Sequence, residues 1–248
     1  LGILAALGAE FLDDTLKTPV DIEKRLKLPV LGIIPKLVKQ TVAQAVDDPR
    51  SGFSEAYRSA RTALQFSTGR GVPKVLLITS AGPGEGKSVT ALTLARNFSR
   101  LGKRVLLIEG DLRNPSLGRS LSIRADKGMS NLLAGAASIN EVVLKTDDKK
   151  LDVILSGPLP PSPTELLSGT KLVSLLTVAS EHYDQIVIDG PPVMGLADAL
   201  LLANASDGTL LMVHSGKTRV HTATSAVKRL ATAHAHLVGS LLSYYDAK

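Results

Sequence analysis

The stretch that decides the fold is VLLITSAGPGEGKSVT, residues 75–90. Its opening residues, VLLITS, form an apolar and β-branched run of strand length, and a helical pattern of apolar residues begins at Val89. Between them lies the glycine-rich segment 82–86, followed directly by Lys87 and Ser88. A strand, a glycine-rich loop, a Lys-Ser pair and a helix, in that order, predict a phosphate-binding loop, or P-loop.

The chemistry of this loop predicts Mg²⁺ and ATP as ligands. Glycines let successive backbone N–H groups face one anion, and the start of the helix adds partial positive charge. Lys87 is expected to reach the β- and γ-phosphates and Ser88 to ligate Mg²⁺. Ala81 stands where the strict pattern has its first glycine, and a small residue there keeps the turn. The alternative is a glycine-rich turn that merely precedes a helix. The residues predicted to contact the nucleotide are Gly82, Pro83, Gly84, Glu85, Gly86, Lys87, Ser88, Val89 and Arg113.

Apolar runs of strand length alternate with helix-like stretches on the C-terminal side of Pro73. They span 75–79, 105–109, 151–155, 185–189, 208–213 and 237–243. Because the runs lack strict alternation, both faces of each strand should be buried. The pattern predicts an α/β P-loop fold, a mostly parallel twisted sheet with helices on both faces. Its ligand-binding loops are expected along one carboxyl edge.

Acidic residues end two of these strands. Glu109 and Asp111 follow the second strand, with Arg113 two residues further on, and Asp189 ends QIVID. Carboxylates at the carboxyl edge beside a P-loop are typical Mg²⁺ partners. The predicted metal set is Ser88, Asp111 and Asp189. The alternative for each carboxylate is a cap on the helix that follows.

Composition narrows the remaining classes. Hydrophobic residues make up 44% of the 248 residues, which is enough for a packed core and argues against wholesale disorder. There is no cysteine, so disulfides and thiolate metal sites are excluded. The net charge is +6, and residues 51–150 hold sixteen basic against eight acidic groups. Because these basic residues are scattered around the P-loop, we expect them to serve nucleotide phosphates and expect no nucleic acid partner.

The first fifty residues form a different segment. LGILAALGAEFLDD, residues 1–14, suggests either a buried helix or the cytoplasmic end of a transmembrane helix. No stretch reaches the roughly 20 apolar residues that cross a bilayer. Thr18 and Pro19 predict a helix start, and residues 28–35 predict a short strand between two prolines. Residues 51–66 predict an amphipathic helix.

Taken together, AGPGEGKS, VLLIEGDLR and IVIDGPP resemble the motifs of the bacterial tyrosine kinases. These are the cytoplasmic domains of polysaccharide co-polymerases, which regulate capsule and exopolysaccharide export. Glu55, Arg58 and Arg61 look like the family's E-x-x-R-x-x-R helix, which mediates ring-like oligomerisation. Residues 156–169 resemble its proline-rich turn, and 11–37 its juxtamembrane segment.

The resemblance implies a division into a juxtamembrane segment, 1–50, that follows a transmembrane helix, and a P-loop tyrosine kinase domain, 51–248. It implies an autokinase that uses ATP and Mg²⁺. It also implies that a carboxylate of the VLLIEGDLR motif, which holds Glu109 and Asp111, takes the proton from the incoming tyrosine. The catalytic residues it implies are Lys87, Glu109, Asp111 and Asp189.

The resemblance also implies partners and a location. It implies a homo-oligomeric ring built through the Glu55, Arg58 and Arg61 helix, and a transmembrane co-polymerase part on the same or a separate chain. It further implies a phosphotyrosine phosphatase as partner and a place at the cytoplasmic face of the bacterial inner membrane.

Two other functions stay open on sequence. One is a nucleotide-gated oligomerisation module of the co-polymerase with little kinase activity, since Glu109 stands where the family has aspartate and only Tyr244 and Tyr245 lie near the end. The other is a partitioning-type ATPase of similar fold. That class usually carries a second lysine where this chain has Gly82.

Overall fold

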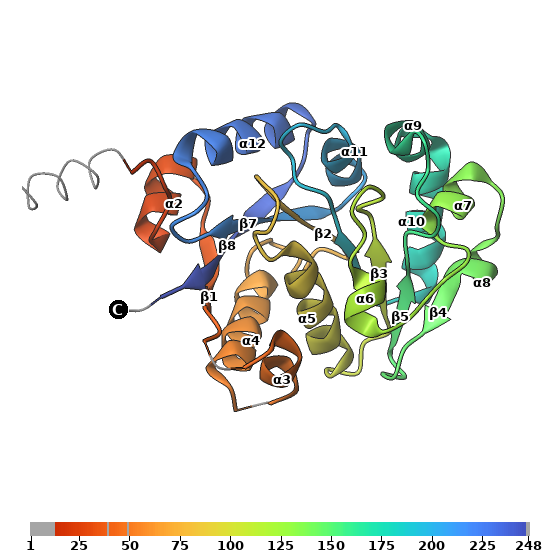
Figure 1. Ribbon diagram of the computed structural model, residues 1–248, viewed down its shortest axis with the longest axis horizontal. Helices are drawn as coiled ribbons and strands as arrows, with labels where there is room; N and C mark the ends of the chain where they lie inside the picture. The colour runs from red at the N-terminus through yellow and green to blue at the C-terminus, as the bar shows by residue number, and fades with distance from the viewer. Residues whose placement is uncertain (1–12, 39, 49, 247–248) are drawn as a thin grey trace, which may run out of the picture.

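One sheet of eight strands runs through the computed structural model, which describes residues 13–38, 40–48 and 50–246 (Figure 1). The strand order is β1-β8-β7-β2-β6-β3-β5-β4. The strands are β1 Val30–Pro35, β2 Val75–Ser80, β3 Val105–Glu109, β4 Val143–Lys145, β5 Leu151–Ile154, β6 Gln185–Asp189, β7 Gly208–His214 and β8 Leu237–Tyr245. Every paired neighbour is parallel except β4 and β5, which are antiparallel. The predicted mostly parallel sheet is therefore confirmed, and β4 is an edge strand that the sequence did not predict.

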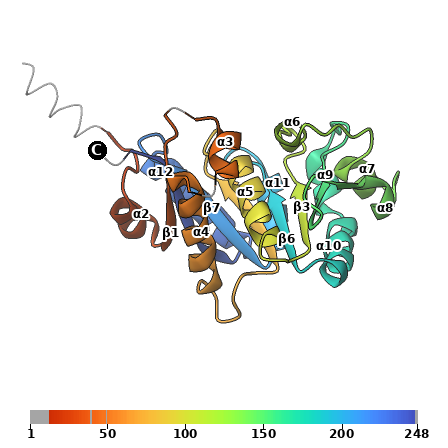
Figure 2. The same cartoon turned by 90° about the horizontal axis from the view of Figure 1, so that it is seen from below.

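Helices cover both faces of this sheet (Figures 1 and 2). One face carries α2 Pro19–Leu26, α7 Met129–Ala134, α8 Ile139–Val142, α9 Pro163–Ser168, α10 Thr170–His182, α11 Asp198–Asn204 and α12 Val220–Thr232. The other carries α3 Val42–Asp47, α4 Gly52–Gln65, α5 Lys87–Ser99 and α6 Leu117–Leu121. Successive residues of β2 alternate between the two cores, Leu77 facing the first and Leu76 the second. Burial of both faces explains why the strands are continuously apolar.

Local signals in the sequence set the helix starts. Thr18 caps α2 in a reciprocal capping box with Asp21, and Pro19 occupies the first helical position. The Ser51 side chain accepts the backbone N–H of Ser54 at the start of α4. Both predicted starts, at Thr18-Pro19 and at residue 51, are confirmed within a residue.

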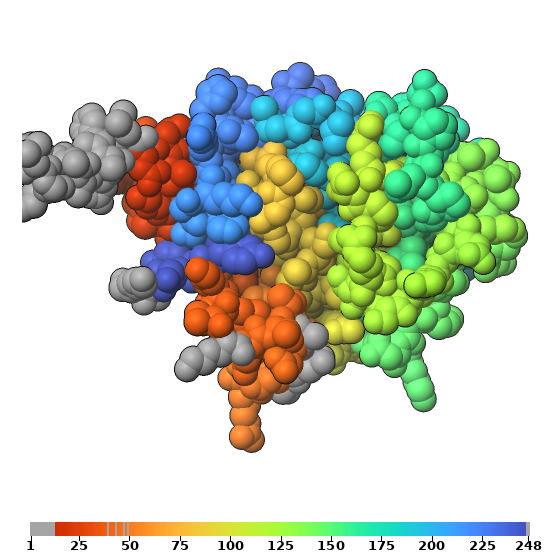
Figure 3. Space-filling model, viewed as in Figure 1, coloured from red at the N-terminus to blue at the C-terminus, as the bar shows by residue number. Residues whose placement is uncertain are grey.

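The described part of the N-terminal segment belongs to the same sheet. Strand β1 pairs in parallel with β8, so the described N-terminal segment lies beside the last strand of the sheet (Figure 3). Leu16 exchanges backbone hydrogen bonds with the loop after β7, donating to Thr218 and accepting from Gly216, both at 2.9 Å. The segment 1–14, for which a buried helix or a transmembrane-helix end was predicted, lies outside the described residues except for Asp13 and Asp14, so the prediction is not tested. Among the helices of the described ranges, none is long and apolar enough to cross a membrane.

The carboxyl ends of β2, β3 and β6 meet at one edge. Ile78 of β2 and Glu109 of β3 both pair in register with Asp189 of β6. The P-loop follows β2 directly, so this edge brings the predicted phosphate loop and the predicted carboxylates together.

Candidate active site

Two glycines shape the P-loop. Gly84 and Gly86 have φ of 72° and 93°, in the left-handed region that L side chains rarely adopt. Gly86 is the N-cap of α5, which begins at Lys87, two residues earlier than the apolar pattern predicts. The first N–H groups of a helix have no partner within the helix, and a glycine-rich loop in front of them is the usual backbone of an anion site.

The buried side chain of Glu85 hydrogen-bonds across the P-loop and to the loop after β7. Its Oε1 accepts the backbone N–H of Gly82 at 3.2 Å and the hydroxyl of Thr218 at 2.9 Å. The residue is 4% exposed, and within the described part of the chain its Oε2 has no hydrogen-bond partner. Burial raises the pKa of Glu85 to about 7, against the hydrogen bonds from Thr218 and Gly82 and the charge of Lys87. Thr218 comes from the loop after β7, and no pattern in the sequence points to it.

Asp189 lies buried beside the end of the P-loop. It is 1% exposed, and its Oδ1 has no hydrogen-bond partner among the residues that the structure describes. Burial raises its pKa to about 7, while a side-chain hydrogen bond from Ser88 and the charge of Lys87 lower it. A buried carboxylate oxygen without a partner, next to a serine hydroxyl, is the oxygen donor set that Mg²⁺ prefers. Ser88 and Asp189 therefore fit the predicted metal role.

Glu109 has a different environment from the one predicted. Its Oε1 accepts the backbone N–H groups of Ser116 at 2.5 Å and Leu117 at 2.6 Å, and its Oε2 accepts that of Ser156 at 2.9 Å. The side chain is buried. Glu109 thus ties the loop after β3 to the loop after β5, and both of its oxygens are already engaged.

Asp111 lies at the start of the next loop. Its Oδ1 accepts the N–H groups of Arg113 at 3.2 Å and Asn114 at 2.9 Å. Its negative charge raises the pKa of Asp189, so the two carboxylates are close enough to interact electrostatically. Asp111 is therefore placed with Asp189, as predicted.

Arg113 makes its strongest contacts away from the P-loop. Its Nε donates to Asp198 Oδ2 at 2.7 Å, and its guanidinium also donates to Thr164 at 3.2 Å. Asp198 is 1% exposed and raises the pKa of Arg113. The Thr164 hydroxyl in turn donates to Asp198. No pattern in the sequence pairs Asp198, in the first turn of α11, with an arginine 85 residues away.

Two hollows flank this centre. A cavity of about 310 Å³ beside Gly86 is lined mostly by apolar and aromatic groups, among them Ile34, Phe53, Tyr57, Val89 and Tyr244, and also by the polar Ser243. The Tyr244 ring stacks on His214, with centroids 4.3 Å apart. A wider hollow of about 680 Å³ lies on the other side, lined by Glu109, Pro115, Arg119, Arg124, Ser156 and Gly157.

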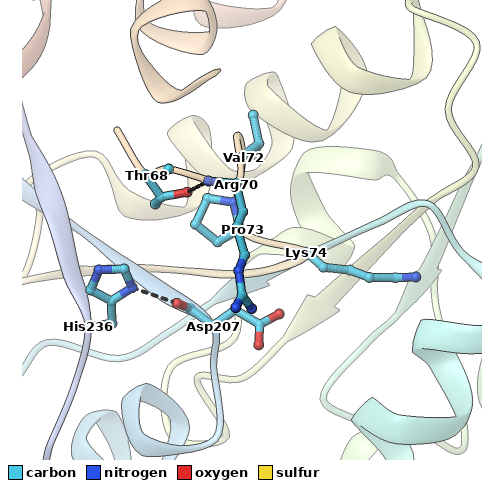
Figure 4. Close-up of a pocket in the computed structure, with 8 residues that line it drawn as sticks. Thr68, Arg70, Val72, Pro73, Lys74, Asp207 and His236 are labelled. Atoms are coloured by element: carbon cyan, nitrogen blue, oxygen red, sulfur yellow. Dashed lines mark hydrogen bonds between the residues drawn. The ribbon is translucent and has the colours of Figure 1, made fainter. Parts of the chain in front are cut away.

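A further hollow of about 650 Å³ lies at the opposite edge of the sheet, where β2, β7 and β8 begin (Figure 4). Its floor is structural: Asp207 accepts the N–H of Val75 at 2.9 Å, and a ring nitrogen of His236 lies 3.0 Å from the Asp207 carbonyl. Because it is at the amino ends of the strands, it is separate from the P-loop chemistry.

A P-loop at the carboxyl edge of a parallel sheet, with a buried carboxylate beside its serine, defines a P-loop nucleotide-binding protein. A family model described as an AAA domain matches residues 73–239. Tyrosine-protein kinase YwqD of Bacillus subtilis (strain 168) is 40% identical over 199 residues, which cover 80% of this chain and 84% of YwqD. The chain belongs to this family of bacterial tyrosine-protein kinases.

Other relatives agree with this assignment. Tyrosine-protein kinase etk of Escherichia coli (strain K12) is 32% identical over 80% of this chain, which spans 27% of that protein. The solved kinase domain of Escherichia coli tyrosine kinase ETK has a TM-score of 0.87 at 28% identity, covering 94% of this chain and 96% of that structure. The chimerical protein CapA2B2 has a TM-score of 0.85 at 29% identity, covering 92% and 99%.

Proposed function

We propose that this chain is an ATP-dependent tyrosine autokinase that regulates capsular or exopolysaccharide polymerisation and export. The observation that carries the proposal is Asp189, a buried carboxylate with one unpartnered oxygen, beside Ser88 at the end of the P-loop. Mg²⁺ would be held by Ser88 and Asp189, with Asp111 close by, and would neutralise charge on the phosphates. Family membership supports the kinase assignment.

The transfer step needs one proton acceptor. The tyrosine oxygen forms a bond to the γ-phosphorus, the bond to the β–γ bridging oxygen breaks, and ADP leaves. Lys87 binds the phosphates through this change. We assign the tyrosine proton to Asp111, because both oxygens of Glu109 already accept backbone N–H groups. Glu109 then positions the loop that carries Asp111.

The two hollows fit the two substrates. The apolar cavity beside Gly86 suits the adenine ring, because it adjoins the P-loop and is walled by Val89 and Tyr244. The open hollow beside Glu109 adjoins the carboxylates and gives an acceptor tyrosine room to enter.

Assembly and location follow from the same family. We propose that residues 1–50 are a juxtamembrane segment and that copies form a ring through α4 at the cytoplasmic face of the inner membrane. A transmembrane co-polymerase part and a phosphotyrosine phosphatase would be its partners. On α4 the Arg58 Nε donates to Glu55 at 2.9 Å, and Arg61 donates to the Asn97 carbonyl of α5 at 3.3 Å. These contacts place the charged side chains of α4 on a partly exposed face, where another copy of the chain could reach Glu55 and Arg58.

The test is phosphate incorporation by the purified chain. Incubation with Mg-ATP should raise the intact mass by whole phosphates, and peptide mapping should place them on tyrosine. Lys87→Ala should abolish the gain, whereas Lys228→Ala, a change of an exposed lysine on α12, should not. Phosphotyrosine that persists in Lys87→Ala would remove the autokinase proposal.

A nucleotide-gated assembly module is the second candidate, and the engagement of Glu109 by three backbone N–H groups favours it. On this view Mg-ATP stabilises a ring and little phosphate is transferred. Sedimentation of the double variant Arg58→Ala, Arg61→Ala tests the interface. Smaller particles support assembly through α4, and an unchanged size contradicts it.

A further inference from the structure

The loop after β7 lies across the P-loop. Thr218 is buried, and its hydroxyl is fixed between the N–H of His214, which it accepts at 2.9 Å, and Glu85, to which it donates at 2.9 Å. The neighbouring residue, Lys217, therefore lies next to a contact with the phosphate loop, and its backbone N–H donates to the His214 carbonyl at 3.2 Å. A methyl group built on Gly84 would lie 3.1 Å from Lys217 Nζ.

The Lys217 ammonium has no counter-ion there. Its side chain is exposed, and within residues 13–38, 40–48 and 50–246 it makes no ion pair or side-chain hydrogen bond. The nearest P-loop carboxylate, Glu85, is turned inward, where its Oε1 is taken by Gly82 and Thr218. An ammonium that lies next to an anion-binding loop and has no carboxylate partner can form a charge-assisted hydrogen bond with a bound phosphate.

We propose that Lys217 is a second phosphate-binding lysine, which contacts the γ-phosphate or the β–γ bridging oxygen of ATP from the loop after β7. Gly84 lies three residues before Lys87, in the part of a P-loop that cradles the terminal phosphates. Within the loop itself Gly82 brings no charge, so Lys217 supplies a cation from the opposite side to Lys87. The inference rests on the proposed function only in taking ATP as the nucleotide.

The position also predicts what Lys217 does during transfer. As the γ-phosphorus moves to the tyrosine oxygen, negative charge grows on the bridging oxygen that leaves with ADP. An ammonium that contacts that oxygen stabilises the transition state more than the bound substrate. Loss of Lys217 should therefore lower kcat as well as the affinity for ATP, and it should affect ADP much less.

The experiment compares the affinities of ADP and a non-hydrolysable ATP analogue, both with Mg²⁺, by isothermal titration calorimetry. Lys217→Gln should weaken the ATP analogue about tenfold while ADP changes less than about twofold. Lys217→Arg should keep most of the affinity, because it retains the charge. Lys228→Gln, the matched loss of an exposed lysine on α12, should behave as the unchanged chain. Thermal melts without nucleotide establish that each variant is folded.

Two outcomes would overturn the inference: unchanged affinity for the ATP analogue in Lys217→Gln, or an equal loss for ADP and the analogue. Because binding is measured without transfer, the result is independent of tyrosine phosphorylation. If Lys217→Gln discriminates the two nucleotides but no phosphotyrosine forms, the phosphate contact stands and only the autokinase proposal falls.

Discussion

At the residue scale, two buried glutamates at the carboxyl edge of the sheet, Glu109 and Glu85, differ in how their oxygens are hydrogen-bonded. Glu109 has backbone donors on both oxygens, so neither of its buried oxygens lacks a hydrogen-bond partner. Glu85 has donors on one oxygen only, and burial raises its pKa to about 7. The first is an anchor for two loops, and the second is a proton-sensitive contact inside the P-loop.

Stability without nucleotide should therefore fall as pH rises. The folded state keeps protons on Glu85 and Asp189 up to about pH 7, whereas the unfolded chain releases them near pH 4.5 and 3.8. Since the folded state binds more protons in this window, the free energy of unfolding decreases from pH 5 to pH 8, by up to about 1.4 kcal/mol per pH unit for each group. Urea unfolding at several pH values measures the slope.

A matched pair of variants assigns that slope. Glu85→Gln should remove the Glu85 share of the slope and leave the Asp189 share, because the amide does not titrate, whereas Glu181→Gln, at an exposed site on α10, should leave the slope unchanged. Equal slopes in Glu85→Gln and the parent chain would show that Glu85 does not hold a proton in the folded state.

Substitutions of Glu109 and of Asp111 should change different quantities, the free energy of unfolding for Glu109 and kcat for Asp111. Glu109→Gln places an amide NH₂ against a backbone donor, so it should lower the free energy of unfolding by about 1–3 kcal/mol. Asp111→Asn should instead lower kcat for tyrosine phosphorylation by about 100-fold or more, with little effect on stability. Denaturant unfolding and kcat, measured on both variants, check the assignment. The reverse result would make Glu109 the proton acceptor.

At the scale of elements, one buried hydrogen bond joins α4 to α5. The Tyr57 hydroxyl lies 2.8 Å from the Thr90 hydroxyl, and both residues are buried. Thr90 is in the first turn of α5, three residues after Lys87. The predicted oligomerisation helix is thus coupled to the helix that presents the P-loop.

Breaking this link should cost stability without a change of shape. Tyr57→Phe removes one hydroxyl and leaves Thr90 without that partner, so we expect a loss of about 1 kcal/mol. A double-mutant cycle with Thr90→Val isolates the pair: the double variant should lose less than the sum of the single ones. Strict additivity would mean that the two hydroxyls do not interact.

Which elements and site residues the sequence predicts depends on how local their causes are. The strands at 75–80, 105–109 and 185–189 are continuous apolar runs, and the starts of α2 and α4 are set by caps a few residues long. The P-loop, Asp111 and Asp189 lie at strand ends, so parallel topology alone brings them together.

Contacts between residues far apart in the sequence could not be predicted from local sequence patterns. Strand β4 has three residues, too few for a periodic pattern, and it pairs only because β5 leaves an edge beside it. Thr218 and Asp198 acquire their roles from partners 133 and 85 residues away, and polar residues in loops carry no pattern that reports such a partner. The anchoring role of Glu109 depends likewise on where the chain returns after β5.

At the scale of the whole molecule, the P-loop is held from both ends of the chain. Leu16 pairs with the loop that carries Thr218, Thr218 contacts Glu85, and Ser243 of β8 donates to the Glu85 carbonyl at 2.9 Å. The nucleotide site therefore depends on the complete sheet, and its occupation should stabilise the molecule as a unit.

Ligand binding should accordingly raise the thermal midpoint. At a Mg-ATP concentration of about 100 times Kd, linkage contributes about 2.7 kcal/mol, which corresponds to a rise of roughly 5–10 °C for a chain of this size. Lys87→Ala should lose most of the rise, while Arg100→Gln, an exposed change at the far end of α5, should keep it. Differential scanning fluorimetry with and without nucleotide gives the comparison. An equal rise in Lys87→Ala would place the nucleotide elsewhere.

The most direct test of the central claim follows the γ-phosphate itself. The purified chain is incubated with γ-labelled ATP and Mg²⁺, and the label is divided between phosphotyrosine and inorganic phosphate, beside the Lys87→Ala and Asp111→Asn variants. The account predicts labelled phosphotyrosine in the parent chain, none in Lys87→Ala and at most about a hundredth of the rate in Asp111→Asn. Label found only as inorganic phosphate, or still in ATP, would contradict a tyrosine kinase and leave a nucleotide-gated assembly module.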